Sequence, residues 1–342
     1  MEFSCPRRDT ESFLAGSAVK ISKERLLQES EATGFRPEII EKVFHLLHLL
    51  ESLCSHPFLK GRFALKGGTA LNLFIFDLPR LSIDIDLNYI GSHQLEVMSK
   101  ERPKIEEALR AVSSREGFAV RRFPVEHAGG KWSLRYESEI GKGGDLEIDL
   151  NFMFRTPLWP VAMKDSKTIG SYKIRQIPVL DIHEIAGGKL TALLARQAAR
   201  DLFDTHHLLT QGGLERERLR LAFVAYGAMN RKDWRTVSVD DLRFDAGEIE
   251  SQLLPLLRRE FLSNIEKPTE WARQLVEGCK DSLSVVLPFS ESEREFFNRL
   301  LDRGQIDPSL LTSDKDLAER IKNHPLIEWK ALNVRQYKKI PD

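Results

Sequence analysis

Residues 82–89 read Ser-Ile-Asp-Ile-Asp-Leu-Asn-Tyr, and this stretch decides how the first half of the chain is interpreted. Polar and apolar residues alternate strictly, so Ser82, Asp84 and Asp86 share one face and the aliphatic residues share the other. Such alternation predicts a strand with one buried face. The two carboxylates lie about 6.5–7 Å apart along a strand. They repel each other near a core unless a divalent cation binds between them. A solvated edge strand would show the same pattern.

A glycine pair precedes this strand in the segment Lys66-Gly67-Gly68-Thr69. Glycines at a strand-to-helix turn let backbone N–H groups approach a phosphate closely, at a helix end whose dipole favours anions. The residue order of a P-loop is absent, so this is not a Walker A motif. The structural alternative is a simple tight turn.

A second acidic segment, residues 146–151, reads Leu-Glu-Ile-Asp-Leu-Asn and alternates in the same way. Glu147, Asp149 and Asn151 therefore share one face of a predicted strand. If this strand lies beside the first, one of its acids can complete a metal site. Carboxylates on neighbouring strands that hold two metal ions are typical of phosphoryl and nucleotidyl transfer.

The segment 181–209 predicts a largely buried helix that carries several charges. Four of them fall on one stripe about 80° wide at 100° per residue: Lys189, Arg196, Arg200 and Asp204. Cations on a buried helix need anionic partners. Either Glu184, Asp201 and Asp204 neutralise them internally, or they face the triphosphate of a nucleotide.

The remaining pattern predicts an α/β first half and an all-helical second half. We expect helices within 17–54, at 69–76 and at 95–116, and strands near 118–123, 131–139, 145–154 and 172–177. From residue 181 onward the periodicity is helical, with breaks near Gly213, residues 238–247, Pro268 and Pro288. We therefore predict two domains, residues 1–180 and 181–342.

The composition narrows the class of protein. The 342 residues include 51 Lys and Arg against 51 Asp and Glu, so the formal net charge is zero. This balance argues against a global electrostatic clamp on nucleic acid but leaves room for a local basic groove. Four basic clusters offer such a groove or a solvated face: residues 115–122, 216–220, 231–235 and 330–339.

The three cysteines, Cys5, Cys54 and Cys279, are scattered and show no CxxC spacing. A disulfide scaffold and a cysteine zinc site are therefore not expected, and the usage fits a reducing cytosol. No run of 18 apolar residues and no signal-peptide core occurs in the sequence. We expect a cytoplasmic protein without a membrane partner.

Taken in order, these motifs resemble the AbiEii family, nucleotidyltransferase-like toxins of the abortive-infection and MenT type. The resemblance spans residues 65–204. It rests on four ordered segments: Lys66-Gly67-Gly68-Thr69-Ala70-Leu71; Arg80-x-Ser82-x-Asp84-Ile85-Asp86-Leu87; Ile148-Asp149-x-Asn151 with Arg155; and Glu184-x4-Lys189-x6-Arg196-x3-Arg200-Asp201-x2-Asp204.

The resemblance implies a DNA-polymerase-β-like nucleotidyltransferase core followed by a helical domain, in a bilobed molecule with the site in the cleft. It also implies Mg²⁺ as cofactor, an NTP donor, a tRNA acceptor end, and an antitoxin that doubles as an AbiEi-like regulator. Such a protein would act in phage defence by inhibiting growth.

The resemblance also implies roles for particular residues. Catalysis would depend on Asp84, Asp86, Lys189 and one or both of Asp201 and Asp204. The nucleotide would be bound by Lys66, Gly67, Gly68, Thr69, Ser82, Arg196 and Arg200. Metal ligands would be Asp84, Asp86 and Asp149, although Asp149 could instead only support the other two.

Three other functions are alternatives for this sequence. A nucleotidyltransferase of this fold could modify a small molecule or a protein. A metal-dependent nuclease could use the acids without needing Lys189. A protein-binding module without catalysis is the third alternative.

Overall fold

The computed structural model describes residues 21–77, 79–124, 126, 128–211 and 213–339. Two helices begin it, α1 (Lys23–Thr33) and α2 (Pro37–Ser55). The Ser22 hydroxyl caps α1 by accepting from the Arg25 N–H, and Pro37 occupies the first turn of α2, where its missing N–H costs nothing. The predicted N-terminal helices are confirmed over these ranges.

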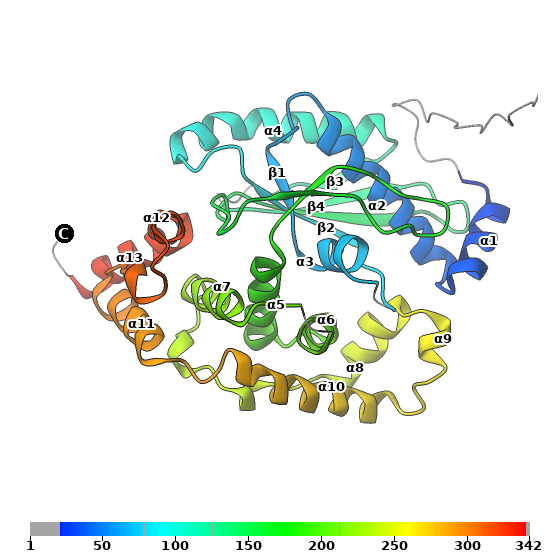
Figure 1. Cartoon of the computed structure of the whole chain (residues 1–342). Coiled ribbons are helices and arrows are strands. Elements are labelled where there is room, and N and C mark those ends of the chain that lie inside the picture. The colour runs from blue at the N-terminus through cyan, green and yellow to red at the C-terminus, as the bar shows by residue number, and fades with distance from the viewer. Residues whose placement is uncertain (1–20, 78, 125, 127, 212, 340–342) are drawn as a thin grey trace, which may run out of the picture.

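The α/β half is built around one seven-stranded sheet (Figure 1). Its strands are β1 (Phe63–Leu65), β2 (Asp84–Tyr89), β3 (Ala119–Arg122), β4 (Gly129–Tyr136), β5 (Gly144–Asn151), β6 (Ala162–Lys164) and β7 (Ile177–Val179). They lie in the order β3-β4-β5-β2-β1-β7-β6. The pairs β2–β5 and β1–β7 are parallel, and the other pairs are antiparallel.

The two faces of this sheet are covered differently. Ile85 and Leu87 of β2 and Ile148 and Leu150 of β5 are fully buried in a core that they share with α2 and α4 (Leu95–Arg115). Figure 1 shows these two helices over one face of the sheet. On the other side lie α3 (Gly67–Ala70), its π-helical continuation Leu71–Ile75, and α5 (Ile182–Arg196). The polar face of β2 and β5 is turned toward these elements.

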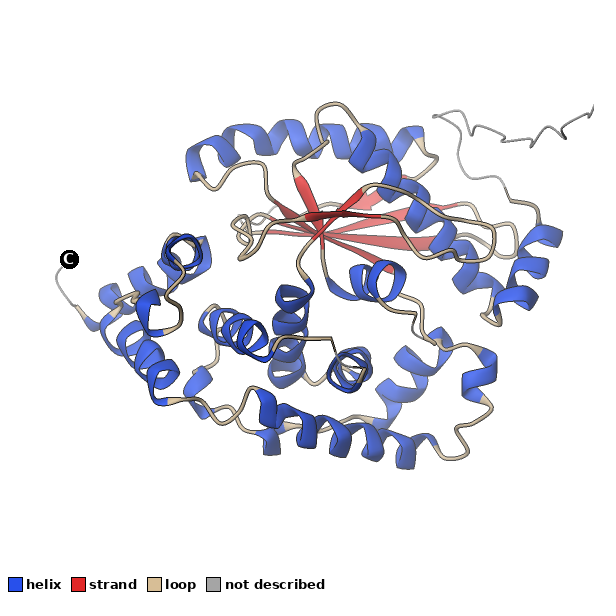
Figure 2. Cartoon of the chain, viewed as in Figure 1, coloured by secondary structure: helices blue, strands red, loops and turns tan. Residues whose placement is uncertain are grey.

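The described residues from 182 onward form helices joined by loops, as Figure 2 shows, with one isolated β-bridge between Leu257 and Arg80. After α5 they are α6 (Ala199–Thr210), α7 (Arg216–Ala228), α8 (Ala246–Glu248), α9 (Arg259–Leu262), α10 (Pro268–Ser282), α11 (Glu291–Arg303), α12 (Lys315–Lys322) and α13 (Pro325–Lys338). A second hydrophobic cluster joins them. Gly187 permits close packing of α5 on α7, since a Cβ there would lie 2.7 Å from the Ala222 Cβ. The predicted fold class, an α/β sheet followed by a helical region, is confirmed.

Two sequence predictions of local structure are wrong. The segment 181–209 is not one helix, because Gln197 adopts a left-handed conformation (φ 58°) and separates α5 from α6. The predicted strand 172–177 does not form: residues 172–176 lie outside any strand, because Gln176 also has positive φ (56°) and Tyr172 forms only an isolated bridge with Ile169, and only Ile177 belongs to a strand, β7. The strands in this region are β6 and β7.

Two further sequence expectations concern cysteines and membranes. Cys54 and Cys279 are free thiols, whereas Cys5 lies outside the described residues. Within the described part of the chain, no helix combines the length and apolar character needed to cross a bilayer. The division into domains at residue 180 stays a prediction, although the chain leaves the sheet just there, between β7 and α5.

Candidate active site

Four carboxylates lie side by side on the polar face of β2 and β5. The parallel register pairs Asp84 with Glu147 and Asp86 with Asp149. The strands are in neighbouring positions of the sheet, so the paired residues are about 4.8 Å apart across it. The structure therefore brings Asp84, Asp86 and Asp149 to one place, from strands separated by more than fifty residues of sequence.

The glycine turn packs directly against one of these acids. Gly67 has φ +68°, and a Cβ there would lie 2.1 Å from the Asp86 Oδ2 atom. Only glycine leaves room for the carboxylate at this point of the turn. The Lys66 N–H donates to the Asp86 carbonyl at 3.0 Å, which fixes the turn to the strand.

The electrostatics at Asp86 suit a cation. Burial raises the pKa of Asp86, and the neighbouring carboxylates of Asp149 and Asp84 raise it further, while Lys66 and Lys189 act in the opposite direction. A divalent cation would relieve both the desolvation and the repulsion. The donor set, carboxylate oxygens alone, is the kind that Mg²⁺ takes.

The arrangement is not a closed metal cage. Among the described residues, no three His, Cys, Asp or Glu side chains are grouped closely enough to hold a metal ion by themselves. Mg²⁺ normally keeps several waters and uses one or two carboxylates together with substrate phosphates. The residues present therefore fit Mg²⁺ that arrives with a nucleotide better than a permanently bound ion.

Two arginines of the helical half face the carboxylates. Arg200 on α6 donates to Asp84 Oδ2 at 3.0 Å, and its side chain is 36% exposed. Arg196, at the end of α5, is 66% exposed and donates to Asp201 at 2.7 Å. Burial lowers the pKa of Arg196, but Asp201, Asp86 and Asp149 raise it overall. Both guanidinium groups thus lie within the field of the acidic cluster.

Lys189 is held in a buried ion-pair network. Its Nζ atom lies 2.7 Å from Asp204 and 3.0 Å from Asp201. Asp204 is fully buried and also accepts two hydrogen bonds from Arg80, at 2.9 and 2.7 Å. Burial alone would raise the pKa of Asp204, but Arg80 and Lys189 hold it below its ordinary value. Asp201 and Asp204 therefore neutralise Lys189 internally, which is one of the two alternatives that the sequence left open.

Ser82, just before β2, and the start of β2 are bonded to the glycine turn. Thr69 hydrogen bonds to the Ser82 hydroxyl at 3.0 Å and donates to the Asp84 carbonyl. A Cβ on Gly68 would lie 3.0 Å from that same Ser82 hydroxyl. Ser82 and Thr69 are buried, so here their hydroxyls organise the turn.

The sequence matches a known protein family. The family model described as "Nucleotidyl transferase AbiEii toxin, Type IV TA system" matches residues 48–298. The chain belongs to the AbiEii family. It is a nucleotidyltransferase toxin of a type IV toxin–antitoxin system, which implies a nucleotide substrate and an antitoxin partner. The predicted family is confirmed.

The fold has a known counterpart. The nucleotidyltransferase toxin MenT4 from Mycobacterium tuberculosis H37Rv superposes with a TM-score of 0.59 at 14% identity, over 90% of this chain and 99% of that one. At this identity the match supports the AbiEii chain's fold alone. A search of curated protein sequences gave no match.

Sequence reasoning gave no role to two residues of the AbiEii site. Arg80 anchors Asp204, and Asn72 of the π-helical segment donates to the Gly68 carbonyl of α3 at 2.7 Å. In the sequence, Arg80 is a charged residue among apolar ones just before Ser82. Its role can be inferred only when its partner, Asp204, is known. No sequence signal marked Asn72.

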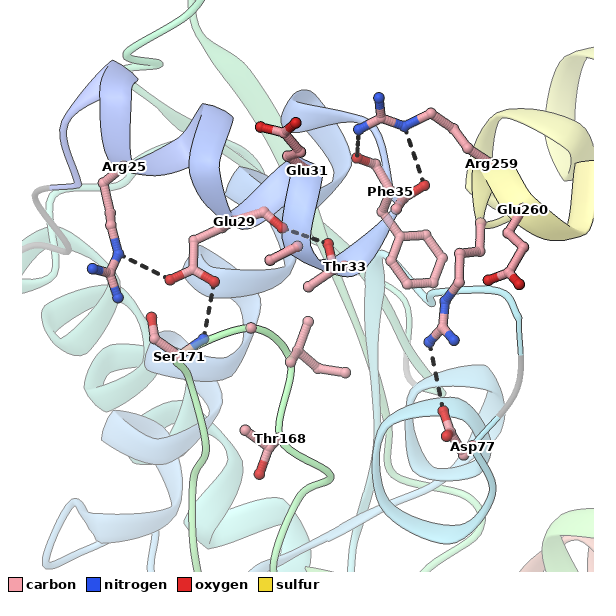
Figure 3. Close-up of a pocket in the computed structure, with 15 residues that line it drawn as sticks. Arg25, Glu29, Glu31, Thr33, Phe35, Asp77, Thr168, Ser171, Arg259 and Glu260 are labelled. Atoms are coloured by element: carbon pink, nitrogen blue, oxygen red, sulfur yellow. Dashed lines mark hydrogen bonds and ion pairs between the residues drawn. The ribbon is translucent and has the colours of Figure 1, made fainter.

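A large hollow of this AbiEii chain lies elsewhere and is structural. It measures about 920 Å³ and is formed where α1 and the α1–α2 turn meet the 168–171 loop and α9 (Figure 3). Most of its charged groups are paired within the chain: Arg25 with Glu29, Arg258 with Asp77, and Arg259 with the backbone carbonyls of Ser30 and Phe35. These contacts fasten α9 of the helical half to the N-terminal helices.

Proposed function

We propose that this AbiEii-family protein is a Mg²⁺-dependent enzyme that moves a nucleotide from an NTP to a hydroxyl of an RNA acceptor, the 3′ end of tRNA. One observation carries this proposal. Paired carboxylates on two parallel strands lie beside a glycine turn and opposite two accessible arginines. This combination offers sites for a divalent cation and for a polyphosphate at the same place.

Asp84 and Asp86 would hold Mg²⁺, with Asp149 as third ligand or as support. When bound, the ion would supply charge neutralisation for the triphosphate and polarise the attacking hydroxyl. The chain's own contribution is position. The Gly67 turn leaves room for the Asp86 carboxylate, and the backbone of Lys66 fixes that turn to β2.

The arginines and the lysine would play different parts. Arg200 and Arg196 expose guanidinium groups that can bind phosphate oxygens bidentately. The Lys189 side chain is only 11% exposed and is shared by two aspartates, so it would act by holding α5 to α6. On this view Lys189 positions the arginines, and it reaches the triphosphate only if it leaves an aspartate.

Two alternatives remain in the same site: transfer to a small molecule or protein, and metal-dependent cleavage of RNA. One incubation separates them. The protein is mixed with Mg²⁺, each labelled NTP in turn, and total RNA. Label in RNA of tRNA size supports the proposal, and label in another product indicates a different acceptor. Shortened RNA without label indicates a nuclease.

The control variants come from the same sheet. Asp84→Asn should abolish transfer and growth inhibition, because it removes a proposed ligand while keeping the side-chain volume. Asp145→Asn changes a carboxylate at the start of β5 whose partner is the surface residue Arg135, and it should leave transfer unchanged. Equal activity of Asp84→Asn and wild type would disprove the metal assignment.

The proposed cellular context is a cytoplasmic toxin controlled by an AbiEi-like regulator and used against phage. The family description supports a type IV antitoxin partner in general terms. Inspection of the neighbouring reading frame tests the specific form. A small winged-helix regulator there supports it, and co-expression should then restore growth.

A further inference from the structure

Two of the four basic clusters, distant in sequence, come together in one groove of the helical half. The groove has a volume of about 570 Å³ and is lined by the segment after α7, by α11 and by α13. Figure 1 shows α11 and α13 side by side at one end of this half, and they pack on one another. The C-terminal helix α13 lies beyond residue 298, where the AbiEii match ends.

Exposed aromatic side chains mark this groove. Trp329 is 50% exposed and Tyr337 is 88% exposed, although both line the groove. They are eight residues apart on α13, or about 12 Å along the helix axis. Leu332, 42% exposed, adds apolar surface on the neighbouring side of α13. Exposed rings at this spacing offer stacking platforms with no partner in the described chain.

The charge of the groove is positive. Its two acids, Asp233 and Asp302, both bind Arg235 at 2.7 Å. Arg231 and Lys330 also line it, and among the described residues neither has a carboxylate within ion-pair distance. The Lys330 ammonium donates to the Asn230 carbonyl at 2.8 Å. Burial lowers the pKa of Lys330, and the charge of Asp233 opposes this only in part, so a further anion beside it would be favourable.

We propose that this groove binds a single-stranded segment of RNA, with Trp329 and Tyr337 stacking on bases and with Arg231 and Lys330 at phosphates. Aromatic platforms combined with cations along a groove are the recognition mode of single-stranded nucleic acid. The chain has zero net charge, so this local excess of cations is the means by which it could retain a polyanion. The groove would hold a part of the acceptor that is distant from its reacting end. The choice of RNA as the ligand rests on the proposed function.

Binding is measured by fluorescence anisotropy with a labelled single-stranded 12-nucleotide RNA, without NTP or Mg²⁺. Tyr337→Ala should weaken binding about tenfold, the effect of losing one stacked base. Tyr337→Phe keeps the ring and should bind as wild type does. Tyr337 is so exposed that its removal cannot unfold the chain. Lys60→Ala, an exposed lysine on the α2–β1 connection, is the matched control and should have no effect.

Salt dependence tests the cations separately. Arg231→Ala and Lys330→Ala should each reduce the slope of log affinity against log salt by about 0.7, as expected for one lost phosphate contact on a single strand. Unchanged RNA affinity in Tyr337→Ala and Trp329→Ala would overturn the proposal. So would a shift in oligomeric state by these variants without RNA binding, because the groove would then be a protein interface.

The assay separates this inference from the proposed function. Asp84→Asn should bind the RNA normally, because the groove does not include β2. If the wild-type protein binds the RNA but transfers no label from NTP, the groove assignment stands and the transferase proposal is refuted. Transfer that persists with no effect of Tyr337→Ala on RNA affinity would refute the groove alone.

Discussion

The Gly67→Ala substitution probes the closest contact of the candidate site. A methyl group at this position would lie 2.1 Å from the Asp86 Oδ2 atom, whereas ordinary contact begins near 3.4 Å. The carboxylate would therefore have to move. Gly61 provides a matched control, because its φ of +75° is nearly the same and a Cβ there meets no atom within 4 Å.

Both substitutions place alanine in a left-handed conformation, which costs roughly 1–2 kcal/mol. Rotation of the Asp86 side chain relieves the contact with Oδ2, but the Asp86 Cβ stays 3.0 Å from the new methyl group. We therefore expect a somewhat larger loss in the free energy of unfolding for Gly67→Ala than for Gly61→Ala. The activities should differ, since displacing a reacting group by about 1 Å costs about 10²-fold in rate.

The assay measures urea unfolding and the rate of label transfer from NTP for both variants. Gly61→Ala should keep wild-type turnover after correction for folded fraction, and Gly67→Ala should lose at least about 10²-fold. Equal turnover in the two variants would refute the placement of Asp86 in the reaction. A much larger stability loss in Gly67→Ala would show that Asp86 is fixed by packing.

Three further substitutions address the buried charges. Lys189→Ala should lower the free energy of unfolding by about 3 kcal/mol. This value is near the low end for a broken buried ion pair, because Asp204 and Asp201 each keep an arginine partner. A loss below about 1 kcal/mol in urea unfolding would contradict the network. Arg80→Ala removes both hydrogen bonds to the fully buried Asp204 and should cost about 3–5 kcal/mol in the same measurement. Burial lowers the pKa of His324 to about 3. Below about pH 6.5 this histidine therefore binds a proton in the unfolded chain but not in the folded one. The free energy of unfolding falls by up to about 1.4 kcal/mol per pH unit from there toward pH 3. His324→Asn keeps an acceptor for the Leu326 N–H and should reduce the fall in melting temperature between pH 7 and 5. Burial also lowers the pKa of His45 and of His207 to about 4, so part of the fall persists, whereas an unchanged slope would refute the contribution of His324.

The sequence predicts those parts of the site that depend on local periodicity. Alternation placed Asp84 and Asp86 on one face and Asp149 on another strand, and β2 and β5 bear this out. The pairing of those strands was not predictable, because it depends on long-range packing that no local pattern records. The break at Gln197 was missed because a non-glycine residue in the left-handed region has no reliable sequence signal.

The same reasoning explains the open question about Asp201 and Asp204. One continuous helix would have placed them roughly 18–23 Å along the axis from Lys189. The turn between α5 and α6 instead brings both to the Lys189 ammonium. The partner of Asp204, Arg80, comes from 124 residues upstream. Burial and ion pairing between residues so far apart in sequence depend on the tertiary structure.

The contact between Asp84 and Arg200 has a consequence for synthesis of the protein on the ribosome. The two residues are 116 positions apart. At roughly 5–20 residues per second, the carboxylates of β2 are made about 6–23 s before the arginine that faces them. The sheet can form during this interval, but a nascent chain that ends before α6 lacks Arg200, Asp201 and Asp204. A growth-inhibiting enzyme would therefore be inert through the first half of its own translation, and chains that terminate prematurely in this region would be harmless to the cell that makes them.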